Sequence, residues 1–307
     1  MPPALPAFAA WRRLALLLPL LLGACAAVCQ PEMANRLPLV NDNARPLVPG
    51  RIDGQPAVLL LDTGAMRTAL LPEALPALNL PGDSLRRSRI LGFGGESNES
   101  NTLINRLELG SLTLEQLTVP VVVHGGRPSR ALSGLIGADL LRAHELEMDA
   151  PGGQVTLYPA QACSGAAPLW PGPTRSIPVE LYGQTLPIVT LRVNGRPVRA
   201  LFDTGAQRTL LPPALAISLG MPESVISGPP SGVAAGIGLG RRTVHHWQAD
   251  RLEFAGLVID RPMLQVADVA KSSPFAMVLG QDVIGQRRFW LSYARQRLFF
   301  DAGAEPR

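Results

Sequence analysis

The sequence predicts an all-β protein built from two similar halves, and two observations lead to this prediction. First, the segment LLLDTGAMRTALLPEAL at 59–75 is nearly repeated as ALFDTGAQRTLLPPALA at 200–216. A repeat spaced by almost half of the 307 residues indicates two copies of one structural unit. Second, 30 glycines and 30 prolines are scattered without a regular period, which favours short strands and turns over long helices. Hydrophobic residues make up 47% and charged residues 17% of the chain, as in globular proteins.

Residues 1–25 are predicted to be a signal peptide. Arg12 and Arg13 precede an apolar run at 14–22 that is too short to span a bilayer as a helix. The run ends in Leu-Gly-Ala-Cys25, which resembles the lipobox of bacterial lipoproteins and implies that Cys25 is acylated. Plain secretory cleavage after Ala-Cys-Ala at 24–26 is the alternative. Either way we expect export. The residue after Cys25 is Ala26 and not the aspartate that is associated with retention in the inner membrane, which implies the periplasmic face of an outer membrane.

Cysteine content and charge exclude some classes of function. In an oxidising compartment Cys29 and Cys163 would form a disulfide, although two free thiols are compatible with the sequence. The net charge of +4 comes from arginines without a dense basic run, so we expect no nucleic-acid partner. His245 and His246 are adjacent and would point to opposite faces of a strand, so we expect neither a metal site nor a cofactor.

The repeat extends through several blocks in each half. Asp53-Gly54 and Asn194-Gly195 are two-residue turn formers between apolar strands, which predicts a hairpin ending in each Asp-Thr-Gly. Two further strands follow at 106–119 and 251–266, then a block with Gly137 or Gly280 that leads into a short helix and a final strand. These blocks define an N-terminal half at 36–160, a Pro- and Gly-rich linker at 161–175 and a C-terminal half at 176–303. We expect the segment HELEMD at 144–149 to be a strand with one wet face.

The paired Asp-Thr-Gly motifs suggest a specific chemistry. In each copy a buried apolar strand leads to Asp62 or Asp203, and a pseudo-two-fold axis would bring the two carboxylates face to face. Like charges this close share one proton and titrate as a unit. The ionised carboxylate can then take a proton from a water, and the protonated one can donate to a carbonyl oxygen. We therefore expect amide hydrolysis with Asp62 and Asp203 as the catalytic dyad.

These motifs resemble those of the retropepsin-like and pepsin-like aspartic proteases. Their signature is an apolar run followed by Asp-Thr/Ser-Gly, and the alanines that follow here, Ala65 and Ala206, are closer to the retroviral type. So is the later block, Leu-Ile-Gly137 and Val-Leu-Gly280, which in that family passes beside the catalytic loop. The resemblance covers both halves and implies two retropepsin-like barrels with the active-site cleft between them. It also implies support of the dyad by Thr63, Gly64, Thr204 and Gly205.

The resemblance suggests two further features. Glycine-containing hairpins would form flaps over the peptide, and the candidates are Gly92, Gly94, Gly95, Gly236 and Gly238; ordinary surface hairpins are the alternative. Retroviral enzymes also brace the dyad with an arginine and an acidic residue. We therefore expect Arg67 to pair with Asp139 and Arg208 with Asp282, unless the two aspartates only cap the helices that follow.

The sequence thus predicts an exported aspartic endopeptidase that cleaves a peptide or protein. We expect it to act as a monomer whose two halves pair with each other as an internal pseudo-dimer. One alternative is a dimer in which each half pairs with a half of another molecule. A second is a lipid-anchored binding protein that kept the fold without turnover, and a third is an envelope scaffold.

Overall fold

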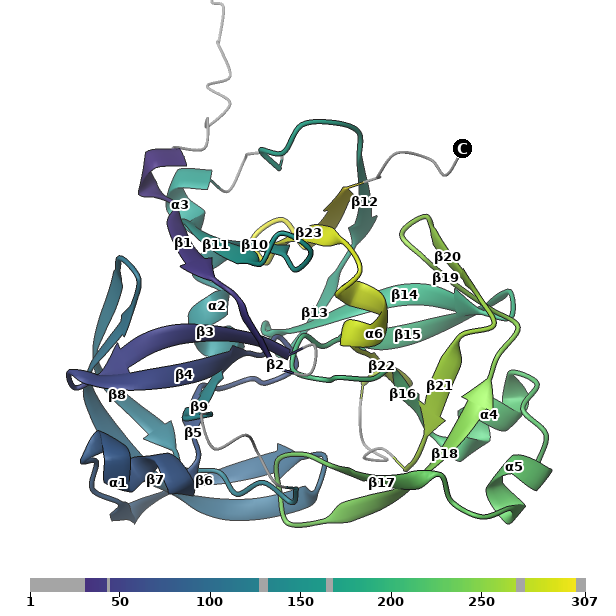
Figure 1. Cartoon of the computed structure of the whole chain (residues 1–307), viewed down its shortest axis with the longest axis horizontal. Coiled ribbons are helices and arrows are strands. Elements are labelled where there is room, and N and C mark those ends of the chain that lie inside the picture. Colours follow the sequence, from purple (N-terminus) through teal and green to yellow (C-terminus); the bar gives the residue numbers. More distant parts are fainter. Residues whose placement is uncertain (1–30, 43–44, 127–131, 164–167, 269–273, 302–307) are drawn as a thin grey trace, which may run out of the picture.

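The computed structural model describes residues 31–42, 45–126, 132–163, 168–268 and 274–301. Strands dominate and form three sheets, one in each half and one to which both halves contribute (Figure 1). The helices are short: η1 (Pro31–Met33), η2 (Pro72–Ala74), α1 (Leu75–Leu78), α2 (Ala138–Leu141), α3 (Ala160–Cys163), α4 (Pro213–Ser218), α5 (Ser224–Ser227) and α6 (Gln281–Ile284). In the described residues no helix has the length and apolar character needed to cross a membrane. The predicted all-β class is confirmed.

The first half contains an eight-stranded sheet. Its order is β5-β9-β4-β3-β7-β6, with β2 added to β3 and β8 added to β7. The strands are β2 (Val40–Asp42), β3 (Arg45–Ile52), β4 (Gln55–Leu61), β5 (Ala69–Leu70), β6 (Asp83–Gly92), β7 (Gly95–Leu109), β8 (Leu112–Pro120) and β9 (Gly134–Ile136). All pairs are antiparallel except β4 with β9, where Leu61 pairs with Ile136. This parallel pair lies directly before the first Asp-Thr-Gly motif.

The second half repeats this arrangement in a ten-stranded sheet. Its order is β17-β18-β21-β16-β22-β15-β14-β19-β20, with β13 added to β14. The strands are β13 (Glu180–Tyr182), β14 (Leu186–Val193), β15 (Arg196–Phe202), β16 (Leu210–Leu211), β17 (Gly232–Ala235), β18 (Arg241–Gln248), β19 (Arg251–Phe254), β20 (Leu257–Asp260), β21 (Met263–Val266) and β22 (Met277–Leu279). Strand β15 runs parallel to β22, with Phe202 paired to Leu279. The expected barrels do not close, because each sheet has two ends and β6 continues toward the other half instead of returning to β5.

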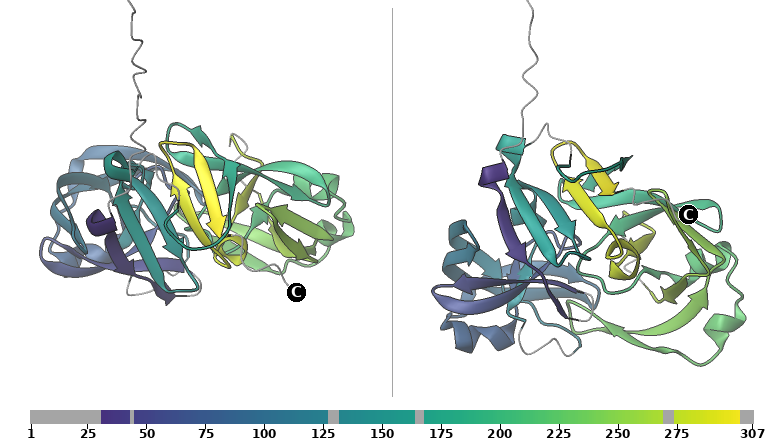
Figure 2. Two further views of the ribbon diagram at one scale, coloured as in Figure 1. Left: turned by 90° about the horizontal axis from the view of Figure 1, so that it is seen from above. Right: turned by 45° about the horizontal axis from the view of Figure 1, so that its top comes forward.

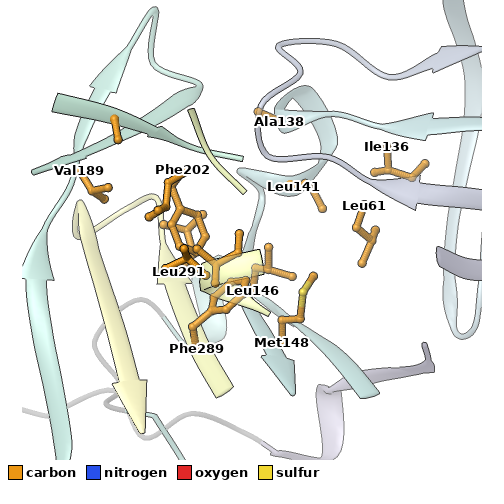
Figure 3. Close-up of a cluster of buried hydrophobic side chains, with 14 of the residues drawn as sticks. Leu61, Ile136, Ala138, Leu141, Leu146, Met148, Val189, Phe202, Phe289 and Leu291 are labelled. Carbon is orange, nitrogen blue, oxygen red and sulfur yellow. The ribbon is translucent and has the colours of Figure 1, made fainter. Parts of the chain in front are cut away.

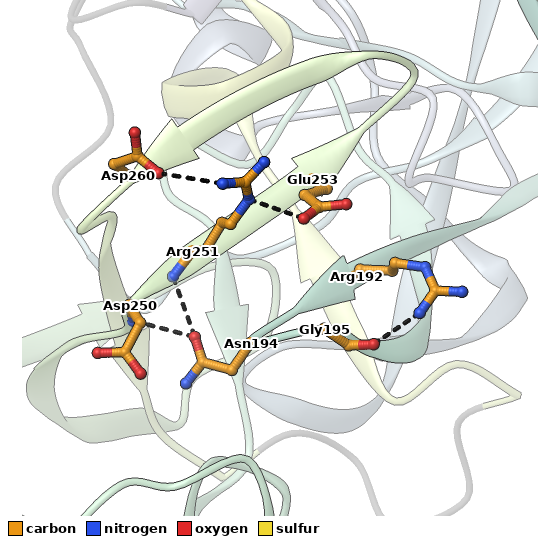
Figure 4. A network of polar contacts seen from close by, with 7 residues as sticks. All are labelled: Arg192, Asn194, Gly195, Asp250, Arg251, Glu253 and Asp260. Atoms are coloured by element: carbon orange, nitrogen blue, oxygen red, sulfur yellow. Dashed lines mark hydrogen bonds and ion pairs between the residues drawn. The ribbon is translucent and has the colours of Figure 1, made fainter.

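The predicted hairpin turns are confirmed, and their polar residues fix the position of the next strand. Asn194 lies in the left-handed region with φ 49°, as the tight turn between β14 and β15 requires. Its Oδ1 accepts hydrogen bonds from the backbone N–H groups of Asp250 (2.9 Å) and Arg251 (3.0 Å) at the start of β19 (Figure 4). In the first half Asp53 Oδ1 accepts in the same way from the N–H of Arg106 (2.7 Å).

A third sheet joins the two halves. Its order is β1-β11-β10-β23-β24-β12, and Figure 2 shows the yellow strands of the second half beside the teal strands of the first. The strands are β1 (Asn35–Pro38), β10 (His144–Asp149), β11 (Gln154–Pro159), β12 (Thr174–Pro178), β23 (Arg288–Ser292) and β24 (Arg297–Asp301). Within this sheet the halves meet at the antiparallel pair β10–β23, with Glu147 opposite Trp290.

The expectation of a wet face on β10 is wrong. Glu145 and Glu147 are 0% and 3% exposed, because β10 is central in the third sheet and covered on both faces. Glu145 accepts hydrogen bonds from Trp290 Nε1 (2.7 Å) and Ser292 Oγ (2.9 Å). Glu147 accepts from Tyr158 Oη (2.8 Å) and Arg288 Nε (2.6 Å). Most of these donors belong to the second half, so the two buried carboxyl groups tie the halves together.

One hydrophobic core runs through both halves. Leu61 and Ile136 lie on the side of the first half, and Phe202 and Phe289 lie on the side of the second (Figure 3). Leu146 and Met148 of β10 fill the space between them. Because the strands that end at the two Asp-Thr-Gly motifs contribute to the same core, their ends are held at a fixed separation.

Candidate active site

Asp62 and Asp203 occupy equivalent places in the two halves. Asp62 follows β4, and its backbone N–H donates to the carbonyl of Ile136 (3.0 Å) on β9. Asp203 follows β15, and its N–H donates to the carbonyl of Leu279 (3.1 Å) on β22. In each half the block before Gly137 or Gly280 therefore runs beside the aspartate loop, as the resemblance implied.

The two aspartate loops are interlocked by their threonines. Thr63 Oγ1 donates to the carbonyl of Phe202 (2.6 Å) and accepts from the N–H of Thr204 (3.0 Å). Thr204 Oγ1 likewise donates to the carbonyl of Leu61 (2.6 Å) and accepts from the N–H of Thr63 (3.0 Å). Both threonines are completely buried. Each half thus supplies the hydrogen-bond partners that the other half's loop needs, which fixes the spacing of the two aspartates.

The carboxyl groups of Asp62 and Asp203 meet at the contact between the halves, close enough that the charge of Asp203 raises the pKa of Asp62. Asp62 Oδ1 accepts from the N–H of Gly64 (2.9 Å), and Asp203 Oδ1 accepts from the N–H of Gly205 (2.8 Å). Each carboxyl group also lies against the glycine of the opposite half. A Cβ atom on Gly64 would be 2.3 Å from Asp203 Cγ, and one on Gly205 would be 2.5 Å from Asp62 Cγ. Glycine is therefore required at both positions by close packing.

The surroundings of the pair favour its protonated form. Burial raises the pKa of Asp62 well above its ordinary value, and the nearby charge of Asp203 raises it further. Burial also raises the pKa of Asp203, and hydrogen bonds from the N–H groups of Ala206 and Gly205 partly oppose this. Two carboxyl groups this close share a proton, so the pair titrates as one unit.

The expected pairing of arginines with aspartates is not formed. Asp139 Oδ1 accepts from Thr68 Oγ1 (2.8 Å) and the Thr68 N–H (2.8 Å), and Asp282 binds Thr209 in the same way. These carboxylates lie inside α2 and α6, and the N-cap positions are Gly137 and Gly280. The alternative role as N-caps is therefore also wrong. The threonines compete successfully because each is buried and offers both a hydroxyl and a backbone N–H to one carboxylate.

Arg67 and Arg208 instead remain exposed. Arg67 Nη1 donates to Ser88 Oγ (3.0 Å) on β6, and Ser88 Oγ donates to Asn101 Oδ1 (2.8 Å) on β7. Arg208 influences Asp282 through its charge without forming an ion pair with it. Both arginines flank the dyad at the same distance in sequence.

The two glycine-containing hairpins meet each other, as flaps would. The Gly94 N–H donates to the carbonyl of Ile237 (2.7 Å), and the Gly240 N–H donates to the carbonyl of Gly94 (3.0 Å). Added Cβ atoms on Gly92 or Gly94 would be 2.2 to 2.6 Å from backbone atoms of Ile237 or Gly238. In Figure 1 these tips meet at the bottom and the third sheet lies at the top, with β4 and β15 in between.

Other predicted flap glycines have different surroundings. Gly236 accepts from the N–H of Gly125 (3.0 Å), and Gly238 donates to the carbonyl of Val123 (2.9 Å). The segment after β8 thus makes isolated bridges from His124 to Ile237 and Gly238 of the second flap, a contact not predicted from the sequence. Gly95, with φ 106°, serves the turn of its own hairpin.

Hydrophobic side chains cross between the halves at these tips. Ile237 packs against a cluster of the first half that includes Leu60, Ala65 and Leu135. Phe93 packs against Leu210 and Val278 of the second half. Neither residue was predicted from the sequence, although Phe93 lies directly between Gly92 and Gly94 and Ile237 directly between Gly236 and Gly238.

Two further findings concern residues outside the dyad. Cys163 is buried and disulfide-bonded, whereas Cys25, Cys29 and the predicted signal peptide lie outside the described residues. Tyr293 is 4% exposed, and its hydroxyl has no partner in the described part of the chain. Burial and the charge of Asp62 raise the pKa of Tyr293.

Comparisons with known proteins agree with this geometry. The model of a family described as aspartyl protease matches residues 48–140 and 189–283, more than half of the chain. DNA damage-inducible protein 1 from Kluyveromyces lactis is 31% identical over 96 residues, which cover 31% of this chain and 22% of that protein. The crystal structure of aspartic proteinase from Irpex lacteus matches with a TM-score of 0.56 and 13% identity, covering 88% of this chain and 99% of the other, which shows a shared fold. The chain therefore belongs to the aspartyl protease family, with one copy of the family's motif in each half.

Proposed function

We propose that this protein is an aspartic endopeptidase whose dyad is Asp62 and Asp203. The supporting observation is that two carboxyl groups, one from each half, each lie against the glycine of the other's Asp-Thr-Gly loop, where burial raises the pKa of both. In the reaction the ionised carboxylate takes a proton from water, and the oxygen of that water attacks the peptide carbonyl carbon. The protonated carboxyl group donates its proton to the carbonyl oxygen. When the C–N bond breaks, a proton passes from the dyad to the leaving amine.

The side chains near the dyad favour a peptide as the substrate. Ala65 and Leu135 lie in one apolar cluster, and Leu210 and Val278 lie in the other. An extended peptide would place its side chains against these clusters and pair its backbone with the flap strands, as in strand addition. No step requires a cofactor.

Substitution of each aspartate tests this function. Asp62→Asn and Asp203→Asn should each lower kcat/KM for peptide cleavage by about 10²–10⁴-fold, because neither asparagine can hold and release the shared proton. Asp260→Asn, at an exposed position on β20, is the matched control and should keep wild-type activity. Activity that survives in either dyad variant would contradict a shared site. Absence of cleavage by the wild type across a range of pH would favour the alternative, a lipid-anchored binding module without turnover.

We further propose that the protein acts as a monomer. In support, the interlocked threonines and the carboxyl contact all occur within one chain. Mixing inactive Asp62→Asn and Asp203→Asn proteins distinguishes the alternatives. Halves that pair between molecules would restore an intact dyad and recover activity, whereas an intramolecular site leaves the mixture inactive.

The proposed location is the periplasmic face of an outer membrane, with lipidation at Cys25. Support comes from the lipobox-like sequence and from the disulfide at Cys163, since disulfides persist in oxidising compartments. Mass spectrometry of the mature N-terminus tests this. An acylated Cys25 in the wild type and a soluble Cys25→Ala variant are expected. An unmodified N-terminus would instead support secretory cleavage.

A further inference from the structure

Arg67 and Arg208 are a pair of exposed positive charges placed symmetrically about the dyad. Each lies five residues after its aspartate, Asp62 or Asp203, in the loop that leaves the Asp-Thr-Gly turn. The backbone of each arginine is packed against the glycine of the following block. A Cβ atom on Gly137 would be 2.4 Å from Arg67 C, and one on Gly280 would be 2.6 Å from Arg208 C. The backbones of the two arginines are therefore closely packed at equivalent points in the two halves.

Asp139 and Asp282 do not neutralise these arginines. Asp139 is bound by Thr68, and Asp282 is bound by Thr209. The charge of Arg208 reaches Asp282, but no ion pair forms between them among the described residues. Arg67 has a neutral partner, the hydroxyl of Ser88. Both charges thus remain available to a ligand.

Arg67 also bridges the dyad loop and a flap. Ser88 lies on β6, and the Ser88–Asn101 hydrogen bond keeps its hydroxyl in place to receive the guanidinium. Strand β6 leads to Gly94, whose backbone bonds to Ile237 and Gly240 of the other flap. The Arg67 side chain therefore stands beside the path that a peptide must follow between the dyad and the flap tips.

We propose that Arg67 and Arg208 select peptides that carry acidic side chains on both sides of the scissile bond. The inference rests on the proposed function, because it assumes that an extended peptide lies across the dyad. An arginine fork suits carboxylate recognition, and both arginines have donors free for this purpose. The pseudo-two-fold axis assigns one arginine to each side of the cleaved bond.

Binding without turnover tests the proposal. The probes are fluorescein-labelled ten-residue peptides with Leu-Leu at the centre and Glu, Gln or Lys at the three positions on each side. They are titrated into the Asp203→Asn protein by fluorescence anisotropy. The Glu peptide should bind most tightly and the Lys peptide most weakly. Adding Arg67→Gln or Arg208→Gln should each reduce the Glu-over-Gln preference about fivefold, as expected for exposed charge pairs. High salt should reduce it as well.

Two controls make the result specific. Arg142→Gln removes an exposed arginine at the end of α2 and should leave the preference unchanged. Arg67→Glu should reverse the charge preference on its side of the scissile bond and therefore improve binding of the Lys peptide. Equal affinities for the three peptides, or a preference that persists after both arginines are replaced, would overturn the inference.

Cleavage of the same peptides by the wild type separates the two proposals. Cleavage without charge preference would refute the role of the arginines and leave the endopeptidase function intact. Charge-selective binding with no cleavage of any peptide would refute the endopeptidase function and keep the assignment of an acidic-peptide site.

Discussion

Replacement of Thr63 by valine should destabilise the protein far more than its small change in shape suggests. Valine keeps the volume of threonine but removes the hydroxyl that donates to the Phe202 carbonyl (2.6 Å) and accepts from the Thr204 N–H (3.0 Å). Both backbone groups would be left buried and unpaired, at a cost of about 1–3 kcal/mol each. Burial of an extra methyl group offsets about 1 kcal/mol. The expected loss of stability is therefore about 1–5 kcal/mol.

Urea denaturation of the chain without residues 1–25 measures this loss. Thr204→Val should have a similar effect, because its hydroxyl makes the reciprocal pair of bonds to the first half. Thr190→Val, at an exposed position on β14, is the control and should change stability by less than about 0.5 kcal/mol. If Thr63→Val were as mild as the control, the interlocked threonines would not hold the halves together.

Three further predictions concern the dyad, the third sheet and the flaps. Gly205→Ala should lower kcat/KM by about 10²-fold, because the added Cβ would displace the Asp62 carboxyl group. Gly232→Ala is the control and should leave kcat/KM unchanged, because its Cβ would meet no atom within 4 Å. Burial raises the pKa of Glu145, so its contribution to stability is complete below about pH 4 and is lost as the pH rises through the folded-state pKa. Glu145→Gln should flatten the decline of unfolding free energy measured from pH 4 to 8, and an unchanged slope would contradict this. Gly94→Ala should speed hydrogen exchange at the Gly240 amide by separating the flap tips, and wild-type exchange there would show that the tips tolerate the added Cβ.

The sequence was sufficient for features that depend on local chemistry. The turns at Asp53-Gly54 and Asn194-Gly195 follow from residues that tolerate a positive φ, and the structure confirms both. The strands before Asp62 and Asp203 follow from their apolar runs. The flap glycines were predicted from the family resemblance, and in the structure Gly92 and Gly94 leave no room for a Cβ against the other hairpin.

Features that depend on which of several neighbouring groups hydrogen-bonds to a given side chain could not be predicted this way. Thr68 and Thr209 hydrogen-bond to Asp139 and Asp282, the carboxylates that the arginines were expected to bind. The polar segment around Glu145 and Glu147 suggested an exposed face, but its partners come from the other half of the chain.

The sequence alone determined that the chain is a duplicated β unit with one Asp-Thr-Gly motif per half, because repeats, turns and apolar periodicity are written in neighbouring residues. Only the tertiary structure decided how the halves join, through crossed threonines, a shared sheet and flaps that meet. It also decided which charges remain free. These outcomes depend on the relative positions of residues about 140 apart in the chain, and burial then selects the partner that satisfies the most hydrogen bonds.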